Sequence, residues 1–277
     1  MLEKIFTQSS QRLKEHRARV PDGQRVYAIG DIHGRLDLLD ALLEKIDREH
    51  DACGKHDAVQ RTIIFLGDYV DRGPDSHGVL ARLSALSGQQ TTTNNAPTKA
   101  GTKYVFLKGN HEAAMLSFLD TPRTDDRWLD WGGSETLESY GIDGAWHRAS
   151  RDLSDDLRAA LPDDHRALLD SLELYHQIGD YVFVHAGVKP GVALSDQAPE
   201  DLLWIRDVFH NAAPEERPQE TIVHGHEPGK RPVNKGWRIG IDTGAVWTGV
   251  LTAVVLEKHE RRFLTVDGPA SDDWINQ

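Results

Sequence analysis

The sequence predicts an α/β fold, on two observations. In the first half of the chain, three short apolar stretches typical of strands are each followed by a polar loop and then by apolar residues at helical spacing. In the second half, after a long helical stretch, the strand pattern returns. The chain has 277 residues, of which 39% are hydrophobic, which is enough to bury a substantial core. We therefore expect a single domain that covers residues 1–277.

The three strand–loop–helix units place polar loops directly after their strands. Residues 25–29 precede GDIHG, residues 62–66 precede GDYVDRG, and residues 103–107 precede KGNHE. The carboxyl ends of neighbouring strands in an α/β sheet open into one crevice. The three loops are therefore expected to meet there.

The rest of the chain divides into a loop, a helical stretch and further strands. Residues 87–103 are polar and contain Gly and Pro, so we expect a mobile surface loop. Residues from about 120 to 175 have mostly helical periodicity and are expected to form a helical insertion. Four more strands are predicted, at residues 181–184, 221–223, 237–241 and 251–256. They place the core of the domain at about residues 25–257.

Charge and composition exclude several classes of protein. The formal net charge of -12 argues against a nucleic-acid-binding surface. The single cysteine, Cys53, excludes an internal disulfide. No stretch resembles a signal peptide, and none approaches the ~20 apolar residues of a membrane span. We expect a cytoplasmic protein without nucleic-acid or membrane partners; the sequence leaves its oligomeric state open.

Candidate metal ligands are concentrated in the polar loops. GDIHG offers a carboxylate and an imidazole two residues apart, and the carboxylate of Asp68 can bridge two divalent ions. Later loops offer histidines in HAG and in HGHEP. The candidates are Asp31, His33, Asp68, Asn110, His185, His224 and His226. Such a mixture of nitrogen and oxygen ligands suits Mn, Fe or Zn better than Ca. Spacing alone indicates a metal-dependent hydrolase of an anionic ester.

The motifs GDIHG, GDYVDRG, KGNHE, HAG, WIRD, GHEP and IDTGAVWTG occur in an order that resembles the phosphoprotein phosphatase family of calcineurin-like metallophosphoesterases. The compact bacterial and phage members are the most similar. The resemblance spans residues 26–256. It implies a β-sandwich of two mixed sheets, flanked by helices and carrying a helical insertion, with the metals at one edge.

The resemblance also implies two divalent metal ions, Mn²⁺ first and Fe or Zn as alternatives, and a ligand set for them. One metal would be held by Asp31 and His33, Asp68 would bridge, and the other metal would be held by Asn110, His185 and His226. The choice of His226 over His224 rests on matching GHEP to the family's GHTP.

Catalytic roles follow from the same resemblance. Arg72 and Arg206 would neutralise the phosphate oxygens, with Asn110 also facing the substrate. His111 would be the general acid, paired with Asp71. A metal-bridging water would attack phosphorus in line, without a phosphoenzyme.

The expected function is hydrolysis of phosphomonoesters, as a protein phosphatase with phosphoserine and phosphothreonine as first substrates and phosphotyrosine as a further one. The alternative is a symmetrical dinucleoside tetraphosphatase. Asp71 and the GNHE motif argue against it, because those relatives carry alanine and GNHD there. A non-catalytic scaffold is less favoured because every expected ligand is present. Two weaker features are open: Asp242 lies near the metals or only closes a turn, and Trp131 begins a structural WGG turn.

Overall fold

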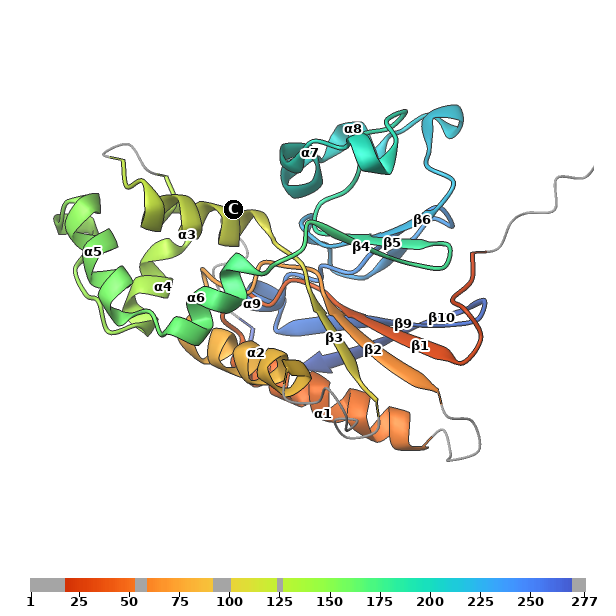
Figure 1. Ribbon diagram of the computed structural model, residues 1–277, viewed down its shortest axis with the longest axis horizontal. Helices are drawn as coiled ribbons and strands as arrows, with labels where there is room; N and C mark the ends of the chain where they lie inside the picture. The colour runs from red at the N-terminus through yellow and green to blue at the C-terminus, as the bar shows by residue number, and fades with distance from the viewer. Residues whose placement is uncertain (1–17, 53–58, 92–100, 124–126, 271–277) are drawn as a thin grey trace, which may run out of the picture.

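Two five-stranded sheets stacked face to face form the centre of the molecule (Figure 1). The computed structural model describes residues 18–52, 59–91, 101–123 and 127–270. The strand order is β10-β9-β1-β2-β3 in the first sheet and β4-β5-β6-β8-β7 in the second. Helices flank both sheets, so the predicted α/β sandwich is confirmed.

The first sheet carries the three repeated units. Its strands β1 to β3 are parallel, and β9 and β10 run antiparallel to complete it. Alternate side chains of β1 face opposite layers: Tyr27 and Ile29 pack against the helices, while Val26 and Ala28 pack against the second sheet. Both faces are thus buried, as a parallel sheet requires. The strands are β1 (Gln24–Ile29), β2 (Gln60–Phe65), β3 (Lys103–Phe106), β9 (Val250–Glu257) and β10 (Glu260–Asp267).

The second sheet brings later loops to the same end of the sandwich. Its strands β5, β6 and β8 are parallel, and β4 and β7 are antiparallel to their neighbours. Phe183 and Val223 face the first sheet, whereas Val182 and Ile222 pack under the helices that follow β5. The strands are β4 (Tyr175–Ile178), β5 (Tyr181–Val184), β6 (Thr221–His224), β7 (Val233–Asn234) and β8 (Arg238–Gly240).

The helices form three groups (Figure 1). Helices α1 (Leu36–Ala52) and α2 (Ser76–Thr91) cover the outer face of the first sheet. One end of the molecule holds α3 (Asn110–Asp120), η1 (Leu129–Trp131), α4 (Gly133–Ser139), η2 (Ala145–His147), α5 (Ser150–Ala160) and α6 (Asp163–Asp170). Above the second sheet lie α7 (Pro199–Trp204) and α8 (Asp207–His210). The short elements η3 (Leu194–Asp196), η4 (Pro214–Glu216) and α9 (Ala245–Thr248) complete the fold. In the described ranges, no helix has the length and apolar character needed to span a bilayer.

Two features of the chain differ from the sequence predictions. Of the predicted loop 87–103, residues 87–91 belong to α2, and residues 92–100 lie outside the described residues. The sheet also continues past residue 257, because β10 pairs with β9 over its whole length. This strand was not predicted because it lies at the edge of the sheet and is partly exposed to solvent. Its sequence, ERRFLTVD, therefore contains charged residues that weaken the apolar pattern. The edge strands β4 and β7 were also missed, because they are only four and two residues long and combine polar with apolar side chains.

Close backbone contact joins the loops that follow β2 and β3. Gly67 has φ +103, and a Cβ atom built on it would lie 2.5 Å from the backbone nitrogen of Gly109. Only glycine combines this conformation with this approach. The packing of the second polar loop on the third therefore depends on Gly67.

We predict that Gly67→Ala lowers the free energy of unfolding by at least about 2 kcal/mol, because it adds a left-handed backbone penalty to a clash with Gly109. The control is Gly88→Ala in α2, where an added Cβ meets nothing within 4 Å and alanine favours the helix by about 0.5–1 kcal/mol. Urea unfolding of both variants measures the difference. Equal stability of the two would contradict the proposed role of Gly67.

Candidate metal centre

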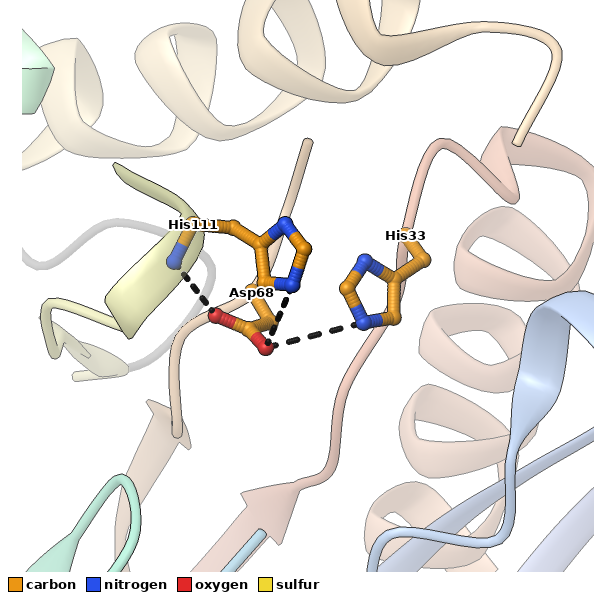
Figure 2. A group of neighbouring side chains, drawn as sticks. All are labelled: His33, Asp68 and His111. Atoms are coloured by element: carbon orange, nitrogen blue, oxygen red, sulfur yellow. Dashed lines mark hydrogen bonds and ion pairs between the residues drawn. The ribbon is translucent and has the colours of Figure 1, made fainter. Parts of the chain in front are cut away.

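The carboxylate of Asp68 lies at the centre of a group of buried imidazoles (Figure 2). Its Oδ2 atom is 3.5 Å from Nε2 of His33 and 3.9 Å from Nε2 of His111. On its other side, Oδ1 is 3.4 Å from Nε2 of His185. Each oxygen of one carboxylate thus faces its own set of ring nitrogens.

Two groups of potential ligands share Asp68. One consists of His33, Asp68 and His111, and the other of Asp68, His185 and His226; within each group the ligand atoms lie within 4.8 Å of one another. All five side chains are buried. A carboxylate shared by two ligand groups is the arrangement that a two-metal hydrolase needs.

Two of these imidazoles direct an unprotonated Nε2 at the cluster. Nδ1 of His33 is 2.8 Å from the Val70 carbonyl, and Nδ1 of His185 is 3.0 Å from the Leu66 carbonyl. A ring nitrogen can bond a carbonyl only by donating its hydrogen, so Nε2 is the acceptor in both rings. Burial lowers the pKa of His33 and of His185, and lowers that of His226 to about 2. Neutral imidazole is the form that binds metals.

Asp31 and Asn110 complete the ring of donors. Oδ1 of Asn110 is 2.8 Å from Nε2 of His185, so the two potential ligands face each other. Asp31 accepts a hydrogen bond from the backbone N–H of His226 through Oδ2, at 3.0 Å. Burial, followed by the charges of Asp242 and Asp68, raises the pKa of Asp31 well above its usual value. Carboxylates crowded together in this way favour a bound cation.

Two buried atoms support the same conclusion. Among the described residues, Oδ1 of Asp31 and Nε2 of His226 have no hydrogen-bond partner. A buried polar atom without a partner is costly and requires an explanation. Both atoms are of the types that bind divalent transition metals. The residues present therefore fit a divalent metal centre.

His111 has a different environment from the other imidazoles. Its Nδ1 is 2.7 Å from Oδ2 of Asp71, which is fully buried and also accepts hydrogen bonds from Trp128 and Thr136. Burial alone lowers the pKa of His111, but the charge of Asp68 together with the hydrogen bond and charge of Asp71 outweighs it and raises the pKa. His111 therefore retains its proton more readily than its neighbours do.

Glu112 holds the loop that carries Asp68. Its carboxylate accepts backbone hydrogen bonds from Asp68 at 2.9 Å, from Tyr69 at 2.7 Å and from Gly109 at 2.9 Å. The loop needs this support because Asp68 has φ +51. His33, Asp71, Arg72 and His226 also have positive φ, so backbone strain is concentrated in the site. In the sequence, Glu112 is recognisable only as part of the KGNHE motif, which does not reveal this supporting role.

The two predicted phosphate-binding arginines lie beside opposite groups of imidazoles. Nη1 of Arg72 is 2.8 Å from Nε2 of His33, so an ion bound to His33 would displace this guanidinium. Arg206 is half exposed and pairs with Glu227 at 2.6 Å. Burial is the largest cause that lowers the pKa of His185 and of His226, and the positive charge of Arg206 lowers both pKa values further. The arginines therefore flank the cluster from two sides.

The structure separates the two histidines of HGHEP. His226 belongs to the cluster, whereas the ring of His224 packs on Phe209 with centroids 5.2 Å apart, and its Nδ1 lies 3.0 Å from the Gly225 carbonyl.

Asp242 is buried near Asp31 and Asp68, and burial is the largest cause that raises its pKa to about 7.

Two tryptophans next to the cluster were not foreseen. The ring of Trp204 lies 6.2 Å from that of His226, and the ring of Trp247 lies 6.4 Å from that of His33. Both occur in motifs quoted above, WIRD and IDTGAVWTG, but their aromatic character was given no role. The available signal was a large aromatic residue within a motif that also contains a candidate site residue, Arg206 or Asp242.

We predict that manganese raises the melting temperature of the metal-free protein by about 5–10 °C at saturating concentration, because the ions bind only the folded state. Asp68→Asn should remove most of this rise, since Asp68 belongs to both ligand groups. Asp143→Asn changes an exposed carboxylate between α4 and η2; it serves as the matched control and should keep the rise. Differential scanning fluorimetry measures all three. A full rise in Asp68→Asn would show that the metal binds elsewhere.

Comparison with known proteins identifies relatives over most of the chain. The calcineurin-like phosphoesterase family matches residues 24–248. A Bacillus velezensis protein named bis(5'-nucleosyl)-tetraphosphatase PrpE [asymmetrical] is 29% identical, covering 84% of this chain and 89% of its own. A Bacillus subtilis protein of the same name is 26% identical, covering 88% and 93%.

Solved structures show the same fold at low identity. A candidate diadenosine tetraphosphatase superposes with a TM-score of 0.58 at 21% identity, covering 89% of this chain and 95% of its own. A serine/threonine phosphatase from Saccharomyces cerevisiae, similar to human phosphatase PP5, gives a TM-score of 0.56 at 18% identity, covering 91% and 82%.

Proposed function

Because the chain belongs to the calcineurin-like phosphoesterase family, we propose that it is a metal-dependent hydrolase of dinucleoside polyphosphates such as diadenosine tetraphosphate. The assignment as a hydrolase is supported by the two buried groups of potential metal ligands that share Asp68. The substrate class is supported by relatives that align with most of the length of this chain and are named bis(5'-nucleosyl)-tetraphosphatases.

The expected protein phosphatase activity is contradicted by the names of these relatives. Asp71 and Glu112, the glutamate of GNHE, were the residues that favoured a protein phosphatase. Both side chains are fully buried, and their partners are protein groups: Asp71 binds His111, and Glu112 binds the backbone near Asp68. Residues that face only the protein interior do not contact the substrate, so they were a poor guide to its identity.

We propose that Asp31 and His33 hold one divalent ion, that Asp68 bridges, and that Asn110, His185 and His226 hold the other. Two such ions, when bound, lower the pKa of the attacking water and neutralise phosphate oxygens. The contribution of the protein is orientation: hydrogen bonds from Nδ1 of His33 and His185 to backbone carbonyls aim each Nε2 at Asp68.

The other residues of the site fit transfer of a phosphoryl group. Arg72 and Arg206 flank the imidazoles and are placed to bind oxygens of the polyphosphate. His111, held by Asp71, is placed to donate a proton to the leaving group. A phosphate leaves more easily than an alcohol does, so proton donation contributes less to cleavage of an anhydride than to cleavage of an alkyl ester.

The products distinguish two modes of cleavage. Cleavage at the centre of the tetraphosphate bridge gives two molecules of ADP, and cleavage off the centre gives AMP and ATP. The relatives are named asymmetrical. We therefore propose AMP and ATP as products, in place of the symmetrical mode that the sequence analysis weighed.

We predict that the manganese-loaded protein hydrolyses diadenosine tetraphosphate to AMP and ATP, and that it does so faster than it hydrolyses a phosphoserine peptide. His111→Asn should reduce the rate, by up to about 10²–10⁴-fold for an alkyl phosphate and by less for the dinucleotide. Product chromatography measures both rates. Faster hydrolysis of the peptide would overturn the proposed substrate.

The two neighbouring histidines of HGHEP provide a matched pair of variants. We expect His226→Asn to lower manganese affinity or activity at least about 10- to 100-fold. Removing only a hydrogen-bond partner of a metal ligand already causes a loss of that size. His224→Asn makes the same change two residues away, outside the cluster, and should keep most of the activity in protein shown by circular dichroism to be folded. The opposite order of effects would assign the ligand role to His224.

A further inference from the structure

Aromatic rings continue the row of imidazoles beyond the metal centre. The ring of His185 lies 5.0 Å from that of His226, that of His226 lies 6.2 Å from Trp204, and that of Trp204 lies 5.4 Å from Trp131. The row thus leads from buried ligands to a tryptophan that is 37% exposed. In the described part of the chain, few large hydrophobic side chains are as exposed as Trp204.

The tryptophan pair joins two separate parts of the fold. Trp204 is the last residue of α7, above the second sheet, and Trp131 ends η1, in the helical end of the molecule (Figure 1). Their rings meet edge to face at an interplanar angle of 62°. In this arrangement Trp131 supports Trp204 from one side, and the exposed part of Trp204 remains accessible to a ligand.

Trp204 is more exposed than its neighbours in α7. The neighbouring Leu202 and Leu203 are buried, whereas Trp204 points out of the helix beside His226. Trp247, on the other side of the cluster, is a less open surface, because the Arg72 guanidinium lies 5.0 Å over its ring. An exposed indole next to a metal ligand is suited to stack on a flat apolar group attached to a phosphate.

We propose that Trp204, supported by Trp131, binds one nucleobase of the dinucleoside polyphosphate; this inference rests on the proposed function. A nucleotide with its phosphate at the metal centre places its base one ribose away, and Trp204 is the exposed ring adjacent to His226. Stacking accepts any base, since every base has a π face. The site should therefore bind nucleotides generally, with little preference between adenine and other bases.

The test compares two ligands that differ only by the nucleoside, ADP and inorganic pyrophosphate. Binding of each to the manganese-loaded protein is measured by calorimetry. Trp204→Ala should weaken ADP binding about 5- to 100-fold, the range expected for loss of one stacked base, and leave pyrophosphate binding unchanged. Trp204→Phe keeps an aromatic face and should retain most of the affinity for ADP.

Trp146→Ala is the matched control. Trp146 is 62% exposed in η2, away from the cluster, and its removal should change neither affinity. Unchanged ADP binding in Trp204→Ala would overturn the proposal, and so would an equal loss for ADP and pyrophosphate, which would indicate damage to the metal centre. Melting temperatures identify any variant that fails to fold. If Trp204→Ala fails to fold, the affinities of Trp204→Phe and Trp204→Leu for ADP and pyrophosphate are compared instead.

The outcome is independent of turnover. If ADP binding requires Trp204 but diadenosine tetraphosphate is not hydrolysed, the base site stands and the proposed function fails. If the dinucleotide is hydrolysed and Trp204→Ala leaves its KM and the ADP affinity unchanged, the proposed function stands and the base site is excluded.

Discussion

The position of the buried Asp68 carboxylate is the constraint on which the rest of the site depends. A carboxylate removed from water is unfavourable unless charges and hydrogen-bond donors surround it. Here His111 donates its backbone N–H to Oδ1 at 3.1 Å, and its ring, which retains a proton more readily than the neighbouring imidazoles, lies with Nε2 3.9 Å from Oδ2. Glu112 then binds the backbone that carries it. Much of the fold serves to bring these groups to one point.

The two sheets make this convergence possible. Parallel strands β1, β2 and β3 end at the same edge as β5, β6 and β8, so residues as distant in sequence as Asp31 and His226 become hydrogen-bonded neighbours. The loops that follow must turn sharply, and several non-glycine residues there adopt positive φ. The buried cores on both sides of the first sheet hold this strained edge in place.

The sequence predicted the parts of the fold whose causes are local. Strands β1, β2 and β5 are apolar on both faces and end in glycine or histidine loops, so pattern and motif agree. Strand β10 was missed because its pairing with β9 is not visible in its own sequence, which begins with three charged residues. The separation of His226 from His224 could be anticipated only by motif matching, since two histidines two residues apart look alike until the backbone turn at φ +64 aims one at the cluster.

Substrate choice was the least predictable property, and the structure shows why. The residues that form recognisable motifs, such as Asp68, Asp71 and Glu112, are buried, and Asp71 and Glu112 bind groups of the protein. Buried side chains of this kind do not contact the substrate, so they do not distinguish one leaving group from another. Discrimination requires side chains that are exposed next to the centre, and these, Trp204 and Arg206, come from the α7–α8 segment that packs on the second sheet. The same metal centre can therefore serve different substrates when only its rim changes.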